Sequence, residues 1–419
     1  MSDPTRFDVA IAGGGMVGMT LAVALADAGF DVAVVDALPV EARAAAAYDG
    51  RSSAIAAGSK RVLETLGLWR GMAAAASPIL DIRVSDARVG EPASALFLHY
   101  DHRDLAVPDT ASEPLGYIVE NRAIRRALLD ALEARPSLAH FAQATVAGFV
   151  AKPGGITLAL ADGRAIEASL AVAADGRDSP LRLAAGIRLA AWDYPQTGIV
   201  CTIGHELPHG NVAHEHFLPS GPFAVLPMVD DEHGHRSSIV WTERRERVPA
   251  ILALDDAGFS AEIERRFGLS LGRIRVIGGR WAYPLRLQHA ERYVAPRLAL
   301  VGDAAHAIHP IAGQGLNLGL RDVAALAEAL VDAKRLGLDI GEGLPLERYE
   351  RWRRVDNLLL AASTDLLNRL FSNDIGPLRL VRDLGLAAVN RAVPLKRFLM
   401  RHAMGLAGDL PRLARGEPL

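Results

Sequence analysis

The residue types and spacing best suited to ligand chemistry lie in residues 298–322, LALVGDAAHAIHPIAGQGLNLGLRD. An apolar strand is expected to end at Gly302 and Asp303, and Gly313 and Gly315 come just before an expected helix. A carboxylate at the end of a strand can accept hydrogen bonds from ligand hydroxyl groups. The first N–H groups of a helix have no partner inside it, so a glycine-rich turn offers them to an electron-rich ligand edge. The segment therefore predicts a binding site for a ligand that carries both kinds of group.

The N-terminal segment carries a second site of this kind. Residues 13–18, GGGMVG, match the pattern G-x-G-x-x-G between an expected strand and an expected helix. In this pattern Gly13 permits the tight turn, Gly15 lets the backbone approach a pyrophosphate, and Gly18 allows close packing of helix on strand. Asp36, at the end of the next expected strand, is placed to accept hydrogen bonds from ribose hydroxyls. The strand, the glycine turn, the helix and the acid occur in the expected order, which predicts dinucleotide binding. This pattern does not distinguish FAD from NAD.

The presence of two distant sites favours FAD. A domain that binds only NAD needs no second strand, acid and glycine-led helix far downstream, whereas FAD has a ribityl chain and an isoalloxazine ring to hold. The alternative is that Asp303 only caps a helix. A third segment, residues 175–182 (DGRDSPLR), follows a buried strand, and Asp175 there indicates another turn that faces a ligand. Arg177 in this segment could instead be solvated surface.

A parallel sheet must position these segments. Short apolar runs at 7–12 and 31–36 flank a helix at 16–28 and form a βαβ unit. Further strands are expected at 116–119 and 171–176, and further helices at 53–69 and 121–134. From 190 to 280, strand-like runs alternate with turns rich in Pro, Gly and Asp, which predicts an inserted antiparallel sheet. Residues 80–106 are expected to join it, and the chain after 320 is expected to be mostly helical.

The expected fold is α/β (α+β overall), with a Rossmann-like FAD-binding domain, an inserted antiparallel-sheet substrate domain and a helical C-terminus. The FAD-binding domain is expected to be discontinuous and to comprise residues 1–80, 107–185 and 281–345. The substrate domain comprises residues 81–106 and 186–280, and the C-terminal helical region comprises residues 346–419.

Composition narrows the class of protein. A chain of 419 residues with 50% hydrophobic and 23% charged residues is ordinary for a globular enzyme of two domains. Its net charge of −3 gives no reason to expect nucleic-acid binding. Cys201 is the only cysteine, which excludes an internal disulfide and fits a reducing cytoplasm. No secretory signal and no transmembrane helix are expected, so any membrane contact would be peripheral.

The three segments together resemble the signatures of group A flavin monooxygenases, the aromatic hydroxylases with the p-hydroxybenzoate hydroxylase fold. More narrowly, residues 302–322, the run RSSAIAAGSKRVLETLGLW at 51–69, and FLPSGPFAVLPM at 217–228 resemble the UbiH/UbiF family. That family hydroxylates the ring of ubiquinone precursors, and the resemblance covers nearly the whole chain. The family more often has Glu where this chain has Asp36, and the shorter acid should still reach a diol.

The resemblance implies cofactor-binding roles in every segment. The implied residues are Gly13, Gly15, Gly18 and Asp36 for the ADP half of FAD; Arg51, Asn121 and Arg122 for the pyrophosphate and ribityl region; Gly302 and Asp303 for the ribityl hydroxyls; Asp175 for FAD and nicotinamide handling; Pro310 for the oxygen pocket; and Gly313, Gly315, Leu316 and Asn317 for the pyrimidine edge of the flavin.

The implied reaction uses NADH or NADPH to reduce FAD and O2 to form a flavin C4a-hydroperoxide, which hydroxylates a polyprenylated phenol. Because the flavin carries the chemistry, no catalytic side chain is expected. Alternatives are a related flavoprotein that acts on another phenol or reduces an alkene, and an FAD-bearing scaffold subunit of a biosynthetic complex. Other ubiquinone-biosynthesis proteins are expected as partners.

Four further features remain to be interpreted. His306 and His309, near the flavin loop, are expected to be structural, with proton transfer as the alternative. No metal site is expected among His205, His209, His214 and His216. An apolar wall over the substrate, or equally the core of a sheet, is predicted for Phe217, Pro219, Phe223 and Leu226. The tail from 391 predicts a basic amphipathic helix that binds either the inner face of a membrane or protein; its apolar face holds Leu395, Phe398, Leu399 and Leu406.

Overall fold

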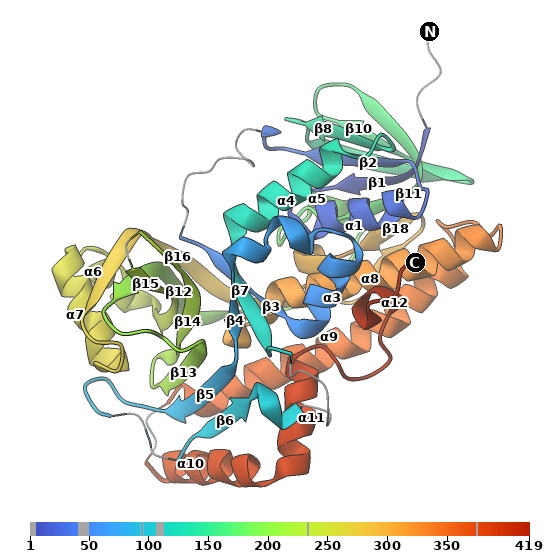
Figure 1. Cartoon of the computed structure of the whole chain (residues 1–419). Coiled ribbons are helices and arrows are strands. Elements are labelled where there is room, and N and C mark those ends of the chain that lie inside the picture. Colours follow the sequence, from blue (N-terminus) through green and yellow to red (C-terminus); the bar gives the residue numbers. More distant parts are fainter. Residues whose placement is uncertain are drawn as a thin grey trace.

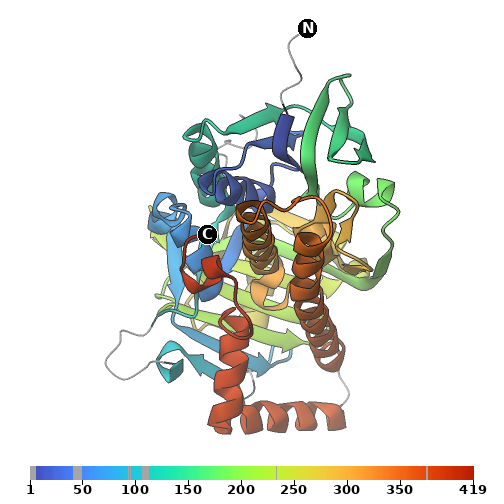
Figure 2. The same cartoon turned by 90° about the vertical axis from the view of Figure 1, so that its right-hand side faces the viewer.

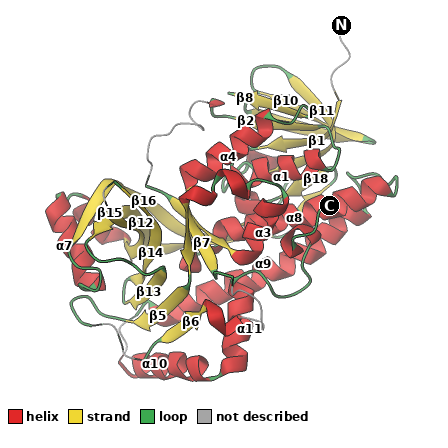
Figure 3. Ribbon diagram, viewed as in Figure 1, coloured by secondary structure: helices red, strands yellow, loops and turns green. Residues whose placement is uncertain are grey.

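The computed structural model describes residues 6–40, 50–92, 94, 96–105, 113–232, 234–373 and 376–419. Its strands form two eight-stranded sheets and one three-stranded sheet. Figures 1 and 3 show the two larger sheets side by side, with the C-terminal helices packed along both. The mixed α/β fold expected from the sequence is confirmed. The domain boundary expected at residue 107 lies outside the described residues.

The first sheet brings the predicted binding segments together. Five parallel strands run in the order β18, β11, β1, β2, β8, with an antiparallel hairpin (β9, β10) and the short β17 at its edges. Because the carboxyl ends of parallel strands share one edge, the turns after β1, β2, β11 and β18 meet there. The bounds are β1 Arg6–Ala12, β2 Val32–Asp36, β8 Leu138–Ala142, β9 Val146–Lys152, β10 Gly155–Leu160, β11 Ala165–Ala173, β17 Val294–Ala295 and β18 Leu298–Leu300.

Helices α1 (Met16–Asp27), α4 (Asn121–Glu133), α5 (Pro180–Ala184) and α8 (Gln314–Arg335) accompany this sheet. The alanine-rich α1 and α8 pack closely: a Cβ at Gly319 of α8 would lie 2.6 Å from Cγ2 of Val17. Two 3-10 turns, η5 (Gly302–Ala304) and η6 (Ile311–Gly313), lead from β18 into α8. The N-termini of α1 and α8 therefore lie next to the shared sheet edge.

The second sheet has the order β19, β16, β12, β15, β14, β13, β5, β6. All its pairs are antiparallel except β13 with β5, which is parallel, so the expectation of an antiparallel sheet fails at this pair. Residues 80–106 do join the sheet, as expected. The bounds are β5 Asp81–Asp86, β6 Leu98–Asp101, β12 Leu189–His205, β13 Val212–Leu218, β14 Gly221–Asp231, β15 Gly234–Arg244, β16 Ile274–Ala290 and β19 His306–Ala307.

Strand alternation gives this sheet an outer and an inner face. On the outer face, Phe223 and Trp241 pack with Phe259 of α7 (Asp256–Phe267), and α6 (Val248–Leu252) adds to the same core. The inner face carries the alternate side chains and meets the loops of the first sheet, since Phe217 of β13 packs against Ile311. The two sheets therefore enclose a layer of side chains between them.

A third sheet, β3 (Ser52–Ala56), β7 (Gly116–Glu120) and β4 (Ala76–Ile79), lies between the two larger ones (Figure 1). The helix predicted for 53–69 is shorter in the structure, where α3 (Ala57–Thr65) begins at Ala57, so that prediction was wrong for residues 53–56 and 66–69. Pairing with β7 satisfies the backbone of residues 53–56 and overrides the weak local helix preference. Four more 3-10 turns are η1 Trp69–Gly71, η2 Ala73–Ala75, η3 His102–Leu105 and η4 Arg245–Arg247.

The C-terminal region is helical, as predicted: α9 Leu344–Phe371, α10 Gly376–Arg391, α11 Val393–Ala403 and α12 Arg412–Arg415. Figure 2 shows α9 and α11 upright, with α10 crossing beneath them. Helix α9 contacts strands of both large sheets, and α12 returns to α3 and α8. Of the helices in the described part of the chain, none is long and apolar enough to span a membrane.

Candidate functional site

Two glycines of the first turn are required by the protein itself. Gly13 has φ +113°, and a Cβ there would overlap the carbonyl oxygen of Ala174. A Cβ at Gly18 would overlap the carbonyl oxygen of Gly13. The turn therefore sits directly on the end of β11, with α1 packed on the turn, and only glycine fits at these positions.

Gly15 and Gly315 are different, because a Cβ at either position would meet no atom of the described residues within 4 Å. Gly15 is the N-cap of α1, and Gly313, with φ +60°, is the N-cap of α8. Within the described chain neither helix has a side-chain cap or an acid in its first turn. Two helix N-termini, each with unpaired N–H groups and a partial positive charge, thus border open space at one edge of the sheet.

Two carboxylates accompany these helix ends. Asp36 is buried at the end of β2; it accepts a hydrogen bond from the Leu38 amide at 3.1 Å and lies so close to Gly14 that a Cβ there would overlap it. Asp303 has a half-exposed side chain, 3.9 Å from Nη2 of Arg177. Helix N-termini suit an anionic pyrophosphate, and carboxylates suit ribose and ribityl hydroxyls. The donors and acceptors present therefore fit FAD, the cofactor expected from the sequence.

Residues 175–182 are tied to the turn at Asp303 by two buried side chains. Arg182 donates from Nη1 to the carbonyl oxygens of Arg177 (3.0 Å) and Ala304 (2.9 Å). Gln288 of β16 donates to the carbonyl oxygens of Arg177 (3.0 Å) and Asp303 (2.9 Å). The sequence offered no signal for Gln288, because only the fold brings β16 against both turns.

Asp175 holds this turn from the other side. It accepts a hydrogen bond from the Leu181 amide at 3.2 Å, and among the described residues its Oδ1 has no partner. Burial raises the pKa of this carboxyl above its usual range. An uncompensated acceptor at this edge is consistent with the ligand-facing role predicted for Asp175.

The predicted residues outside the first sheet also converge. The side-chain oxygen of Asn121 accepts a hydrogen bond from Oγ of Ser53 at 2.7 Å, and the backbone N–H of Asn121 donates to the carbonyl of Arg51 at 3.0 Å. Arg122 forms an ion pair with Glu120. Pairing of β3 with β7 explains why Arg51, Asn121 and Arg122 lie together although about 70 residues separate them in sequence.

The side chain of Asn317 links α8 to β3. Its Oδ1 accepts from the Ala56 amide at 2.9 Å, and its Nδ2 donates to the carbonyls of Ala54 (2.9 Å) and Gly313 (3.2 Å). These bonds use the side chain within the protein, so only the backbone near Gly315, Leu316 and Asn317 is left for a ligand. The prediction for this segment also concerned its backbone.

A buried polar network stands behind the Gly302–Asp303 turn. Asp322 of α8 is fully buried and accepts hydrogen bonds from the Gly302 amide (3.1 Å), Nε of Arg353 (2.9 Å) and Nδ2 of Asn357 (3.1 Å). Its carboxylate is also 2.5 Å from Nε2 of His306. No role was predicted for Asp322 or Arg353 from the sequence. The available signal was the occurrence of an acid and an arginine on helix faces that are otherwise apolar.

Burial by itself would raise the pKa of Asp322, but His306 and Arg353 outweigh it and hold that pKa at about 2. The carboxylate therefore stays charged at neutral pH. This arrangement supports the structural role predicted for His306.

His309 has a different environment. It is fully buried, its ring lies edge-on to Tyr194 with centroids 5.2 Å apart, and neither ring nitrogen is bonded to a described residue. Burial lowers the pKa of His309 to about 4, so the ring is neutral at physiological pH.

A cavity of about 160 Å³ lies where the loop after Asp303 meets the inner face of the second sheet. Pro310, predicted from sequence to shape the oxygen pocket, belongs to its wall, together with Val200 and Val240. Arg177 and Arg286 also line this cavity, so its lining carries positive charge as well as apolar surface. The full lining is Arg177, Gly198, Val200, Val240, Tyr283, Pro284, Leu285, Arg286, Ile308 and Pro310.

The four residues predicted as a substrate wall are split between the two faces of the sheet. Phe217 and Leu226 lie on the inner face, Phe217 packed against Phe371 with ring centroids 4.3 Å apart. Phe223 lies on the outer face, fully buried beside Trp241, which fits the sheet-core alternative instead. Pro219 follows β13 in the turn to β14 and is partly exposed.

The histidines of the second sheet do not converge on one point. His214 and His216 pack against Phe267 on the outer face. His205 is the last residue of β12, and His209 lies in the connection from β12 to β13. A different group of the described residues, Asp81, His99 and Asp101, has ligand atoms within 4.8 Å of one another. Asp101 there already makes a bidentate pair with Arg103, 2.6–3.0 Å, so its carboxylate is occupied.

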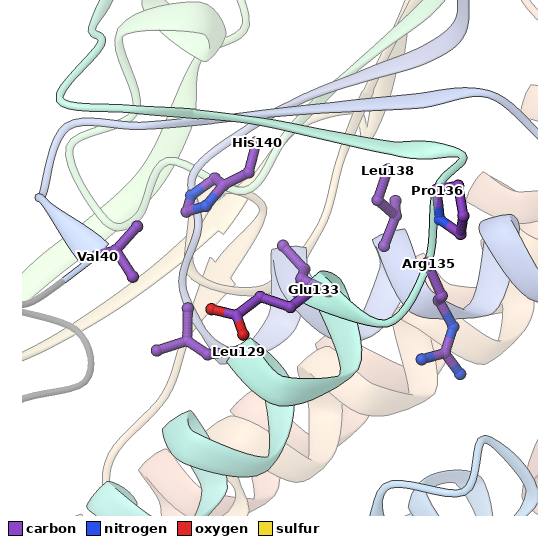
Figure 4. A pocket seen from close by; sticks show the side chains of 8 residues that line it. Val40, Leu129, Glu133, Arg135, Pro136, Leu138 and His140 are labelled. Atoms are coloured by element: carbon purple, nitrogen blue, oxygen red, sulfur yellow. The ribbon is translucent and has the colours of Figure 1, made fainter.

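A second cavity, of about 310 Å³, lies at the far end of α4 (Figure 4). Glu133 and His140 point into it, and Leu129 and Val40 close its sides. Glu133 is about 18 Å along the helix from Asn121. None of the residues predicted to bind the cofactor lines this cavity.

Comparisons with known proteins agree with this geometry. Residues 6–350 match the family described as FAD binding domain. The chain is 53% identical to the ubiquinone hydroxylase UbiL of Rhodospirillum rubrum, covering 98% of this chain and 93% of that protein. It is 38% identical to the 3-demethoxyubiquinol 3-hydroxylase of Escherichia coli, covering 95% of this chain and 98% of that protein. The p-nitrophenol 4-monooxygenase PnpA of Pseudomonas putida shares the fold, with a TM-score of 0.78 at 19% identity over 96% of this chain and 99% of PnpA.

Proposed function

Because the chain belongs to the FAD binding domain family, and within it to the FAD-dependent hydroxylases of ubiquinone biosynthesis, we propose that it hydroxylates the aromatic ring of a polyprenylated phenol. NADH or NADPH would provide the electrons, and O2 the oxygen atom. The 53% identity to a ubiquinone hydroxylase over nearly the full chain supports this choice of substrate class.

We propose that the edge of the first sheet holds the cofactor. The turn from Gly13 to Gly18 and the N-terminus of α1 would hold the pyrophosphate, and Asp36 would accept hydrogen bonds from the ribose. Asp303 would accept them from the ribityl chain, and the N-terminus of α8 would face the electron-rich pyrimidine edge. Arg51, Asn121, Arg122 and Asp175 would complete the site. Bound FAD supplies the redox chemistry, taking electrons from the nicotinamide and activating oxygen.

The chain's own residues would then orient the phenol and keep water away from it. Val200, Val240, Ile308 and Pro310 give the cavity an apolar wall, which favours an aromatic ring and protects reactive species from solvent. Arg177 and Arg286 at the same cavity add positive charge that suits the anionic phosphates of a nicotinamide cofactor.

The position of Pro310 is the observation that carries this proposal. This residue ends the loop that runs from Asp303 toward α8, and it also lines the cavity against the second sheet. A flavin ring held by Asp303 and α8 would therefore border a cavity large enough to admit part of an aromatic ring.

Purified protein should be yellow and contain stoichiometric FAD, and a prenylated phenol should stimulate its oxidation of NAD(P)H. Asp303→Ala should lower FAD retention, whereas Asp162→Ala, an exposed acid on the β10–β11 turn, should leave it unchanged. Unchanged FAD content in Asp303→Ala would contradict the cofactor assignment. Normal FAD content without phenol-dependent oxidation would contradict the hydroxylase proposal.

We also propose a peripheral membrane contact through α11. Val393, Leu395 and Phe398 expose about half of their surface, and Arg397 and Arg401 lie exposed on the same helix. A helix with exposed apolar and basic residues suits an anionic lipid surface, where a polyprenylated substrate would reside. The exposed apolar face of α11 holds fewer residues than the sequence predicted. Helix α11 ends at Ala403, and Leu406, which was predicted to belong to this face, packs near the buried Met400 and Met404.

A further inference from the structure

One row of side chains crosses the inner face of the second sheet from the Pro310 cavity to the far strands. The strand registers pair Val200 with Val240, Val240 with Ala224, Ala224 with Glu215, and Glu215 with Val84. Neighbouring strands lie about 4.8 Å apart, so Glu215 is about 10 Å from Val240, with only the small Ala224 between them. Glu215 is the one charged residue in this row.

The row borders accessible space. Val200, Val240, Glu215 and Val84 all keep partial exposure, although they lie on a face that the rest of the protein covers. On the outer face, the neighbouring Trp241 and the residues around it are fully buried. The row therefore runs from the cavity beside Pro310 toward β5, with partly exposed side chains on both sides of the buried Ala224.

Glu215 is an unusual residue on this face of the sheet, because its carboxyl group has no partner there within the described part of the chain. Among the described residues it has no hydrogen-bond partner and no ion pair, and Phe217 and Ala213 beside it on the same strand face are apolar. Burial raises the pKa of Glu215 to about 8. The carboxyl of Glu215 is therefore partly exposed and yet desolvated. Because an unpaired buried carboxyl is costly to stability, a ligand is the natural source of its partner.

Resting on the proposed function, we propose that Glu215 binds the ring hydroxyl of the phenolic substrate. A phenol laid over Ala224, between Val240 and Glu215, would have its ring beside Pro310 and its hydroxyl at the carboxylate. The phenol O–H donates to an oxygen of Glu215, which fixes the ring's orientation and increases electron density on the ring. An electron-rich ring is the form that a flavin hydroxylase attacks.

Other charged groups on this side of the sheet are already engaged. Asp86 of β5 is 2.7 Å from Arg382 of α10, and Lys396 of α11 is 2.7 Å from Asp104. Tyr100 of β6 faces the same side, and burial raises its pKa to about 12, so it stays neutral in the assay range. On β14 the residues of this face next to Glu215 are apolar. In the loop before α8, burial lowers the pKa of His309 to about 4, so its ring is neutral in the assay range. At the cavity end of the row, Arg177 and Arg286 lie within 4 Å of Asp303 and Asp193, respectively. The carboxyl in the row is therefore the group that should titrate near pH 8.

The test compares Glu215→Gln with the wild type and with Glu246→Gln, the same change at an exposed site on η4. Loss of a charged hydrogen bond should lower kcat/KM for the phenol by about 10- to 100-fold. In the wild type kcat/KM should rise with pH through about 8, because the carboxylate is the accepting form, and the rise should vanish in Glu215→Gln. FAD content should not change in either variant, and Glu246→Gln should also leave NAD(P)H oxidation unchanged.

Stability gives a second readout. If Glu215 serves the ligand, Glu215→Gln and Glu215→Leu should unfold at the same temperature as the wild type or higher, because each removes an unpaired buried acid. Wild-type kcat/KM and pH profile in Glu215→Gln, or a lower unfolding temperature in both variants, would overturn the proposal. If the wild type binds FAD but does not hydroxylate any prenylated phenol, the proposed function fails, whatever the variants show.

Discussion

At the scale of single residues, the glycines of the binding edge serve two purposes. Gly13 and Gly18 are glycines because neighbouring backbone occupies the place of their side chains. A Cβ at Gly15 or Gly315 would meet no described atom within 4 Å, so the protein itself tolerates a side chain there, whereas the cofactor in the proposed site would not. Substitution to alanine can therefore separate folding from cofactor binding at positions only two residues apart.

Gly13→Ala and Gly15→Ala form a matched pair for this comparison. Gly13→Ala should lower the free energy of unfolding by several kcal/mol, about 1–2 from the positive φ and the rest from overlap with Ala174. Gly15→Ala should change apoprotein stability by less than about 0.5 kcal/mol and weaken FAD binding. Urea unfolding of the apoproteins and fluorescence titration with FAD measure the two effects. Wild-type FAD affinity in Gly15→Ala would contradict a pyrophosphate at this turn.

At the scale of elements, Asp322 fastens the Gly302 turn to both α8 and α9. It accepts hydrogen bonds from Gly302 of the turn and from Arg353 and Asn357 of α9. Removing the charge of a buried, paired acid typically costs about 3–5 kcal/mol. The Gly302 turn therefore depends on Arg353 and Asn357, which lie outside all three sequence signatures.

Asp322→Asn should accordingly be less stable than the wild type at pH 7, and the difference should shrink in acid. The folded pKa of Asp322, about 2, lies below its ordinary value of 3.8. A depressed folded pKa stabilises the protein above pH 4, and this stabilisation is lost as the pH falls from 4 toward 2. Chemical unfolding at several pH values measures the difference. Asp162→Asn, at an exposed ion pair, is the control, and a pH-independent difference for Asp322→Asn would contradict the account.

The sequence was sufficient to predict four of the five parallel strands, the first helix and the three turns, because glycine spacing and apolar runs are local signals. It did not predict β8, which pairs in parallel with β2. It failed where pairing between distant segments decides the outcome. Residues 53–56 form a strand only because β7 lies beside them, and β5 pairs in parallel with β13. Phe223 and Leu226 were both predicted to belong to an apolar wall, but they are three residues apart on one strand, so their side chains lie on opposite faces of the sheet. No role was predicted for Glu215, which lies between two histidines in the sequence, because only the structure shows that its side chain lies on the inner face of the second sheet.

At the scale of the whole molecule, the C-terminal helices combine packing with exposed apolar surface. Met400 of α11 is buried in the cluster that holds Met228 and Ala213, while Leu395 and Phe398 of the same helix are exposed. Helix α9 also exposes Leu359 and Leu366, at 62% and 65%. A monomer in water gains nothing from this exposure, which suggests a surface that meets lipid or protein.

The double variant Leu395→Ser, Phe398→Ser should bind less to vesicles that contain anionic phospholipid, because the apolar contact is removed while the arginines remain. Co-sedimentation measures binding, and Leu336→Ser, an exposed leucine at the end of α8, is the control. Equal binding of the double variant and the wild type would show that α11 does not contact the membrane.

In the proposed function, FAD bound at the first sheet hydroxylates a phenol held against the second sheet. The decisive experiment is incubation with ¹⁸O2, NADH or NADPH, and a prenylated phenol, followed by mass spectrometry. The expected product has one additional ring hydroxyl that carries ¹⁸O, formed in proportion to the NAD(P)H oxidised. Oxygen derived from water, or NAD(P)H oxidation that yields only hydrogen peroxide with every phenol tried, would contradict the proposed function.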